Sequence, residues 1–431
     1  MVTARRTDPG EAVRRSVAAV WRIESARIVA TLTRAVGDFG RAEDLAQDAL
    51  ADALAQWPES GIPANPGAWL TAVAKRKAID GWRRRERYDD RLATITRDLE
   101  QDLARDTASG ADDLPWDPDR IDDDVLRLMF VACHPVLSRE ARVALTLKVI
   151  GGLSSDEIAR AFLVPTSTVQ QRIVRAKKTL AAAKVPFEAP DRAEFGARLG
   201  AVLGVLYLVF NEGYAASAGD DWMRPDLCRE AMRLARVLAG LVPDEPEVHG
   251  LVALTELTAA RFPARLDASG DPVLLADQDR RRWDRGAITR GRAALARADA
   301  VGRGRGAYAL QAAIAECHAV ASGVDDTDWE RIVVLYEALG RLAPSPVVDL
   351  NRAAAVAMAS GPQDALDIVD RLVADGRLAR YRMLPATRAE LLVRLGRFDE
   401  ARTEFAAALE LTENTRERVI LERKCASLPA P

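Results

Sequence analysis

Cationic and aromatic side chains are interleaved along one predicted helix, residues 68–87, in a pattern that suits a nucleic-acid strand. Lysine and arginine contact phosphates, and tryptophan rings stack on unpaired bases. Burial in the core is an alternative role for the tryptophans, because Trp69 is in helical register with Ala72, Val73 and Ile79. The residues that this pattern selects for nucleic-acid binding are Trp69, Lys75, Arg76, Lys77, Trp82, Arg83 and Arg84.

A second segment has the spacing of a helix-turn-helix. Ser154 and Glu157 form a capping box, with Ser154 at the N-cap and Glu157 at the third helical position, so a helix is predicted to start there. The pattern breaks at Pro165 and restarts at Thr166. An ordinary helical hairpin with a basic exterior is the alternative interpretation.

The second helix of this motif divides into an apolar face and a polar face. We expect the apolar positions to face inward: Val169, Ile173, Ala176 and Leu180. Glutamine can bond adenine bidentately and arginine can bond guanine, so the outward positions suit base recognition. These outward positions are Thr168, Gln170, Gln171, Arg172, Arg175 and Lys178.

An amphipathic helix with an acidic face is predicted between Arg41 and Trp57. Its apolar face comprises Ala42, Leu45, Ala46, Ala49, Leu50, Ala53, Leu54 and Trp57. Asp44, Gln47, Asp48 and Asp52 recur at three and four residues and form one exposed stripe. This stripe either pairs with basic residues of another protein or is a solvated face.

These motifs, in this order and with an acidic linker before the helix-turn-helix, resemble the sigma-70 family in its short extracytoplasmic-function form. Residues 38–49 look like the family's polymerase-binding helix, which implies that Asp44, Gln47 and Asp48 contact the clamp helices of the largest polymerase subunit. Residues 68–80 look like the segment that melts and reads the −10 element, although Arg76 stands where the family commonly has asparagine.

The helix-turn-helix resembles the domain that reads the −35 element, with Gln170, Gln171, Arg172 and Arg175 at the matching contact positions. The resemblance therefore implies two partners: promoter DNA and core RNA polymerase, including the flap of its second largest subunit.

Composition and motif order predict an all-α chain with three helical regions. Of the 431 residues, 48% are hydrophobic and only 5% aromatic, with few β-branched runs. The expected organisation is a first sigma-type domain at 11–97, an acidic linker at 98–124, a second at 125–185 and a large helical extension at 191–431.

Small and large residues in the extension are spaced as in paired antiparallel helices. Gly361 and Gly396 lie roughly one ~34-residue repeat apart, which resembles tetratricopeptide repeats. This pattern, with Leu206–Tyr214 and the Asp-Gln-Asp-Arg stretch at Asp277, looks like the sigma subgroup with a long C-terminal extension that regulates the sigma domains. Such repeat surfaces bind proteins or peptides.

Other function classes find little support in the sequence. The four cysteines are scattered, and Cys133-His134 and Cys317-His318 lack a further ligand pair at zinc spacing, so we expect no metal or cofactor. The longest apolar run is shorter than a membrane span and no secretion signal is evident, so we expect a cytoplasmic protein without a membrane role.

Two alternatives to a sigma factor remain at this stage. One is a conventional helix-turn-helix regulator with a helical sensor domain, which ignores polymerase. The other is an enzyme in the C-terminal region, built around Asn211, Glu212 and Tyr214. One carboxylate without a base, nucleophile or metal partner specifies no reaction, so we expect no catalytic residues and no enzyme activity.

Overall fold

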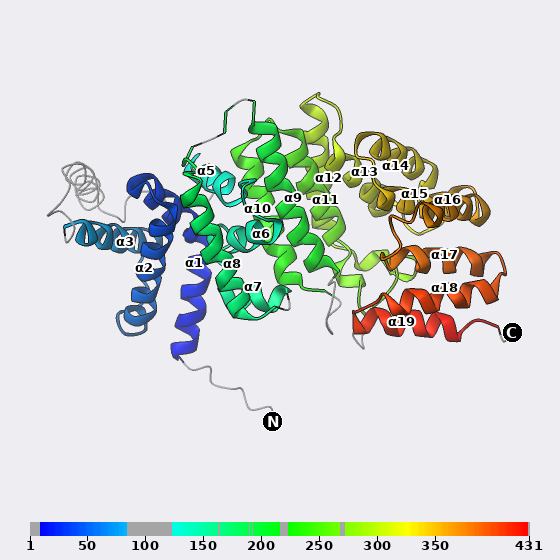
Figure 1. Ribbon diagram of the computed structural model, residues 1–431, viewed down its shortest axis with the longest axis horizontal. Helices are drawn as coiled ribbons and strands as arrows, with labels where there is room; N and C mark the ends of the chain where they lie inside the picture. Colours follow the sequence, from blue (N-terminus) through cyan, green and yellow to red (C-terminus); the bar gives the residue numbers. More distant parts are fainter. Residues whose placement is uncertain are drawn as a thin grey trace. The chain divides into compact units, whose positions relative to one another are not determined.

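The computed structural model describes residues 9–83, 123–215 except 163, 189 and 192, 223–267 and 272–429. Within these residues the chain forms helices and no strand, and Leu266 and Pro272 form an isolated bridge. The predicted all-α fold is therefore confirmed (Figure 1). The chain divides into two compact units, residues 1–205 and 206–431.

Three helices begin the first unit. They are α1 (Pro9–Val36), α2 (Phe39–Ser60) and α3 (Pro66–Arg83), and each packs against the other two. Gly37 ends α1 with a positive φ of 71°, which only glycine adopts without strain, and Asp38 then caps α2 by accepting a hydrogen bond from the Arg41 amide at 2.8 Å.

Four shorter helices complete the part of the first unit that carries the predicted helix-turn-helix. They are α5 (Asp123–Ala132), α6 (Arg139–Val149), α7 (Ser155–Phe162) and α8 (Thr166–Ala182). Asp124 is buried in the first turn of α5, where its carboxylate pairs with Arg34 of α1 at 3.0 Å and with Arg127 at 2.5 Å. Helix α5 thus includes the last two residues of the predicted linker, and residues 98–122 lie outside the described residues.

Helix α9 (Phe195–Tyr214) is longer than the apolar run noted in the sequence. By length and composition alone it could cross a membrane, a test that core helices also pass. Its side chains Val202, Leu206 and Phe210 are buried within the protein.

The second unit continues as a series of helices in which consecutive members pack together. After α9 come α10 (Pro225–Leu241), α11 (Pro246–Ala259), α12 (Arg285–Ala300), α13 (Ala307–Val320), α14 (Trp329–Leu342), α15 (Pro346–Ala359), α16 (Pro362–Asp375), α17 (Met383–Arg394), α18 (Phe398–Glu410) and α19 (Thr415–Ala426). Three short 3₁₀ helices, η1 (Phe262–Ala264), η2 (Leu275–Asp277) and η3 (Arg280–Arg282), lie between α11 and α12.

Close backbone contact holds the centre of this unit together. A side chain at Gly250 of α11 would lie 2.7 Å from the amide nitrogen of Ala309 on α13, so only glycine fits this crossing. Glu247, one turn earlier, accepts hydrogen bonds from the amides of Tyr308 and Ala309 at 2.8 and 3.1 Å and thereby caps α13.

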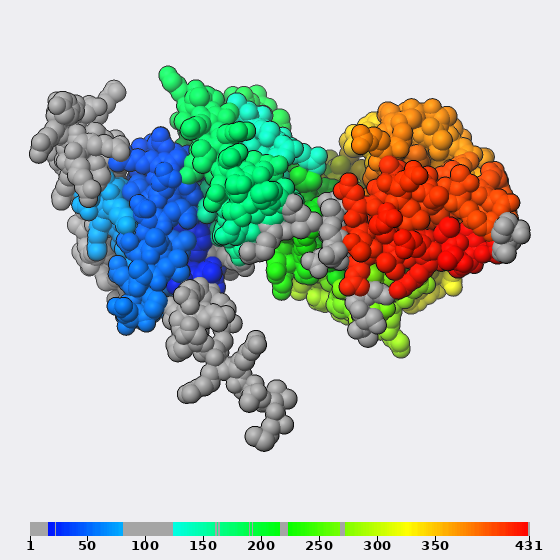
Figure 2. Space-filling model, turned by 60° about the horizontal axis from the view of Figure 1, so that its bottom comes forward, coloured from blue at the N-terminus to red at the C-terminus, as the bar shows by residue number. Residues whose placement is uncertain are grey.

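The last helices form two hairpins that turn at the predicted glycines. Gly361 between α15 and α16 has a φ of 112°, and Gly396 between α17 and α18 has a φ of 75°. Four small residues of these hairpins are fully buried: Ala353, Ala365, Ala389 and Ala401. In Figure 2 these helices, coloured orange to red, form one closely packed surface.

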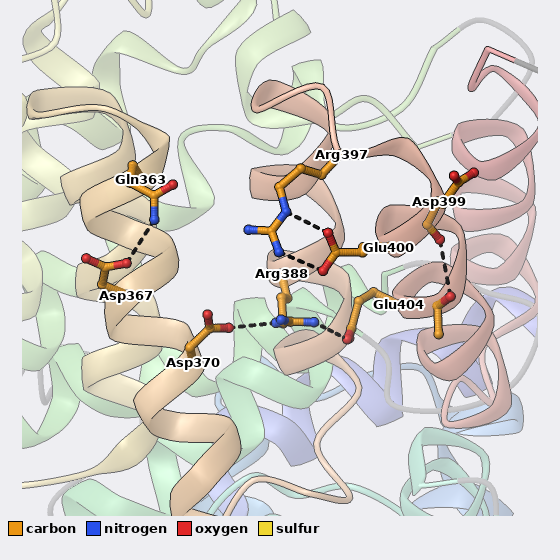
Figure 3. A network of polar contacts seen from close by, with 9 residues as sticks. Gln363, Asp367, Asp370, Arg388, Arg397, Asp399, Glu400 and Glu404 are labelled. Carbon is orange, nitrogen blue, oxygen red and sulfur yellow. Dashed lines mark hydrogen bonds and ion pairs between the residues drawn. The ribbon is translucent and has the colours of Figure 1, made fainter. Parts of the chain in front are cut away.

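An arginine connects the two hairpins. Arg388 of α17 donates hydrogen bonds to Asp370 of α16 at 2.8 Å and to Glu404 of α18 at 2.6 Å (Figure 3). Charge-assisted hydrogen bonds of this kind fix the register of neighbouring helices.

Candidate nucleic-acid and protein interfaces

The helix-turn-helix forms through the local contacts that the sequence predicts. The Ser154 amide donates to Glu157 Oε2 at 2.8 Å, and the Glu157 amide donates to Ser154 Oγ at 3.1 Å, which is a complete capping box. Across the turn, the Thr166 hydroxyl donates to Asp156 Oδ1 at 2.8 Å and thereby fixes the start of α8 relative to α7.

Helix α8 buries the face that its periodicity predicts. Its buried residues are Val169, Ile173, Ala176 and Leu180, which confirms the predicted apolar face. Of the outward positions, Gln170, Gln171, Arg175 and Lys178 are exposed, whereas Thr168 and Arg172 are half-buried. This surface has the amide and guanidinium groups that read base edges in a major groove.

One cation of α8 that the sequence analysis did not select forms a long-range contact. Lys177 Nζ pairs with Glu43 and, at 2.9 Å, with Asp44 Oδ1, both on α2. Burial of the ammonium group opposes its ionisation, but the charges and hydrogen bonds of Glu43 and Asp44 outweigh burial and raise the pKa of Lys177. Helix α8 therefore contacts the first residue of the acidic stripe on α2, Asp44, whose side chain nevertheless remains exposed.

The contact between α2 and α8 is incompletely packed. Beside it lies a cleft of about 650 Å³, whose lining includes Phe39, Val174 and Phe187. Val174 is 49% exposed, an uncommon position for a large apolar side chain. The contact between α2 and α8 therefore includes an ion pair, and an incompletely filled cleft with apolar side chains lies beside it.

The remaining residues of the acidic stripe on α2 differ in their surroundings. Asp48 is exposed and Gln47 is half-buried, whereas Asp52 pairs with Lys77 of α3 at 2.9 Å. Leu54, predicted on the apolar face, is 41% exposed, so that part of the prediction was wrong. The buried face instead includes Phe39 and Glu43, the latter as the partner of Lys177.

Helix α3 brings only some of its predicted nucleic-acid residues to the surface. Trp69 is half-buried, with its ring edge-on to Trp57 at 5.3 Å between centroids, and Lys75 is buried. Arg76 is exposed and Lys77 is held by Asp52. The side chains of Trp82 and Arg83, and all of Arg84, lie outside the described residues.

Several residues of the enzyme and metal-site alternatives make structural contacts. Glu212 pairs with Arg224 at 2.5 Å, and the Tyr214 ring lies 3.7 Å from the guanidinium carbon of Arg265. Cys133 is buried against the Thr146 hydroxyl at 3.3 Å, and burial raises the pKa of its thiol to about 11. These groups are engaged in packing and ion pairing.

Three family models match successive parts of the chain. Residues 22–88 match Sigma-70 region 2, residues 127–180 match Sigma-70, region 4, and residues 198–299 match a Family of unknown function (DUF6596). The first match contains α2 and α3, and the second contains α7 and nearly all of α8.

Two curated relatives extend this comparison. The chain is 45% identical to Uncharacterized protein R00370 of Rhizobium meliloti (strain 1021) over 405 residues, which cover 93% of this chain and 92% of the relative. It is 32% identical over 166 residues to the Probable ECF RNA polymerase sigma factor SigI of Mycobacterium tuberculosis, covering 38% of this chain and 54% of that protein. No solved structure matches the chain.

Proposed function

We propose that this chain is an alternative sigma factor of the sigma-70 family, regulated by its own C-terminal helical extension. The matches to Sigma-70 regions 2 and 4 and the similarity to an ECF RNA polymerase sigma factor support this proposal. Core RNA polymerase and promoter DNA are the partners that a sigma factor requires. The polymerase supplies the chemistry of transcription, so the chain itself acts as an initiation factor in the cytoplasm.

Each proposed interface lies on one helix. Asp44, Gln47 and Asp48 of α2 contact the clamp helices of the largest polymerase subunit, while the second domain also meets the flap of the second largest. Helix α3, with Arg76 at its surface, contacts the −10 element. Helix α8 enters the major groove at the −35 element.

The observation that carries this proposal most directly is the surface of α8. Gln170, Gln171 and Arg175 are exposed on the face opposite a buried apolar stripe, at the second helix of a capped helix-turn-helix. Side chains with two hydrogen-bonding groups in this position distinguish base pairs.

Replacing Arg175 with alanine tests the role of α8. We expect run-off transcription from the chain's own upstream region, with bacterial core polymerase, to fall about fivefold, because one base contact is worth ~1 kcal/mol or more. Arg297→Ala, an exposed arginine on α12, is the matched control and should leave the transcript unchanged. Equal yields from the Arg175→Ala variant and the unaltered chain would remove α8 from the promoter contact.

The proposed regulatory role of the extension rests on its separate compact structure. Residues 206–431 form their own unit, and its last helices include two hairpins that turn at Gly361 and Gly396, an arrangement that supports the proposed tetratricopeptide-like repeats. Such repeats present surfaces for partner proteins or peptides, which supports a signal-receiving role.

Removing the extension measures its effect on transcription. The full chain and a chain ending after residue 205 are compared in run-off transcription, with core-polymerase binding and circular dichroism showing that the shorter chain is folded. We expect the two transcript yields to differ, and the sign of the difference identifies inhibition or activation. Identical yields from folded proteins would argue against a regulatory extension.

A further inference from the structure

The second unit contains a cavity of about 320 Å³ that the sigma function does not use. Its wall is formed by η2, η3, α13, α14 and α15, and by the segment before α14. The apolar lining is Leu275, Val324, Trp329, Ile332, Tyr336 and Met358. A mostly apolar cavity of this volume, with a few polar groups, is typical of a small-molecule site.

A buried cation lies in the cavity wall. Arg280 is only 6% exposed, and it donates hydrogen bonds to the carbonyl oxygens of His318 and Ala321 at 2.8 and 3.1 Å and to the Thr327 hydroxyl at 3.1 Å. All three acceptors are neutral. In the part of the chain that the structure describes, no carboxylate forms an ion pair with Arg280.

The Arg280 guanidinium carbon lies 5.2 Å from the centroid of the Trp283 ring, and no carboxylate among the described residues pairs with this guanidinium. Burial lowers its pKa, the charge of Arg261 lowers it further, and Asp326 opposes them from beyond ion-pair distance. A guanidinium has five N–H donors, of which these contacts use three. Two donors therefore remain for an anion, and a carboxylate accepts two parallel hydrogen bonds from one guanidinium.

A second polar group in the wall has one buried atom without a hydrogen-bond partner. His318 lines the cavity, its ring lies edge-on to Trp329 with 5.2 Å between centroids, and its Nδ1 atom is buried without a hydrogen bond. Burial and the nearby charges of Arg261 and Arg280 lower the pKa of His318 to about 4, so the ring is neutral at pH 7. A buried polar atom without a partner costs free energy, and a bound polar ligand is one way to recover it.

The mouth of the cavity is apolar and open to solvent. Met358 and Ala354 line it from the exposed face of α15, and Leu274 beside η2 is also exposed. An aromatic or aliphatic body can therefore enter and lie against Trp329 and Tyr336. The one cation in this lining, together with the cavity's size, matches a monoanion with a single ring or short chain.

We propose that this cavity binds a small organic carboxylate, with its carboxylate group against Arg280 and its apolar body against Trp329, Tyr336 and Met358. This assigns a role to the Asp-Gln-Asp-Arg stretch, whose other side chains build the loop. Gln278 donates to the Val273 carbonyl at 2.9 Å, and Asp279 caps η3 by accepting from the Arg281 amide at 3.0 Å. The binding itself does not depend on the sigma function.

Titration calorimetry of the full chain with benzoate and indole-3-carboxylate tests the proposal, with benzamide as the neutral probe of matching shape. We expect at least one carboxylate to bind at millimolar concentration or below, and benzamide to bind at least about fivefold more weakly than benzoate, because it lacks the charge. Absence of binding by both carboxylates, or equal affinity for benzamide and benzoate, would overturn the proposal.

A variant that fills the cavity locates the site without disturbing the buried arginine. Ala354→Phe places a ring at the mouth and should weaken carboxylate binding at least about fivefold, since the ring occupies the ligand's space. Ala293→Phe on the exposed face of α12 is the matched control and should leave the affinity unchanged. Unaltered binding by a folded Ala354→Phe variant would place the ligand elsewhere and overturn the assignment.

Discussion

Reversing the charge at Asp48 with lysine is expected to reduce the affinity for core RNA polymerase about 100-fold. Asp48 is exposed on α2. The proposed contact brings it against a basic surface, where a reversed charge replaces attraction with repulsion. Close charge pairs across protein interfaces contribute ~1.5–7 kcal/mol, so the sum of a lost attraction and a new repulsion reaches ~3 kcal/mol. Fluorescence anisotropy of labelled protein with bacterial core polymerase measures the change.

A second acidic residue on the same helix provides the control for Asp48. Glu59 is exposed near the end of α2, outside the acidic stripe, and Glu59→Lys changes the net charge by the same amount. Its affinity for core polymerase should remain close to that of the unaltered chain. If Asp48→Lys also bound normally, α2 would not be the polymerase contact, and tight specific binding of free duplex would then favour a conventional regulator.

Replacing Lys177 with glutamine is expected to strengthen core binding about tenfold. Its ammonium group holds Glu43 and Asp44, so the proposed contact through Asp44 requires this pairing to break. Removing the charge removes that cost, which we place at ~1.4 kcal/mol, because Lys177 and Glu43 are largely shielded from solvent although Asp44 is exposed. The same binding assay without promoter DNA is the appropriate measurement, because Lys177 also lies on the proposed DNA-reading helix.

Lys178, the neighbouring lysine on α8, provides the control for the effect of Lys177→Gln on core affinity. Lys178→Gln removes the same charge from α8, but Lys178 is exposed and forms no ion pair with the described residues of α2, so core affinity should not rise. The difference between the variants should also shrink with increasing salt, because screening weakens the partly exposed pair. A Lys177→Gln variant that binds no better than the unaltered chain would show that the pair does not oppose polymerase binding.

Short-range pattern was sufficient to predict the helix-turn-helix. The capping box joins residues three apart, and the buried face of α8 follows from the helical period alone. The glycine turns of the two hairpins were likewise visible, because a positive φ selects glycine whatever packs around it.

Which charges are buried could not be read from the sequence, because distant partners decide it. Glu43 is buried by Lys177, a residue far away in the chain, and Lys75 is buried although every cation of its segment was assigned to the surface. Leu54 shows the reverse case, since a position in helical register is buried only where another element covers it. The carboxylate cavity was also hidden, because its wall combines residues 275–358 from separate elements.

The two hydrogen bonds of Arg388 couple the C-terminal helices mechanically. Its guanidinium is held by Asp370 on one side and by Glu404 on the other, so α16 or α18 cannot slide along α17 without lengthening one of these bonds. Strain applied to one hairpin is therefore passed to the next instead of being absorbed between them. Displacement of either hairpin therefore acts on the other through Arg388.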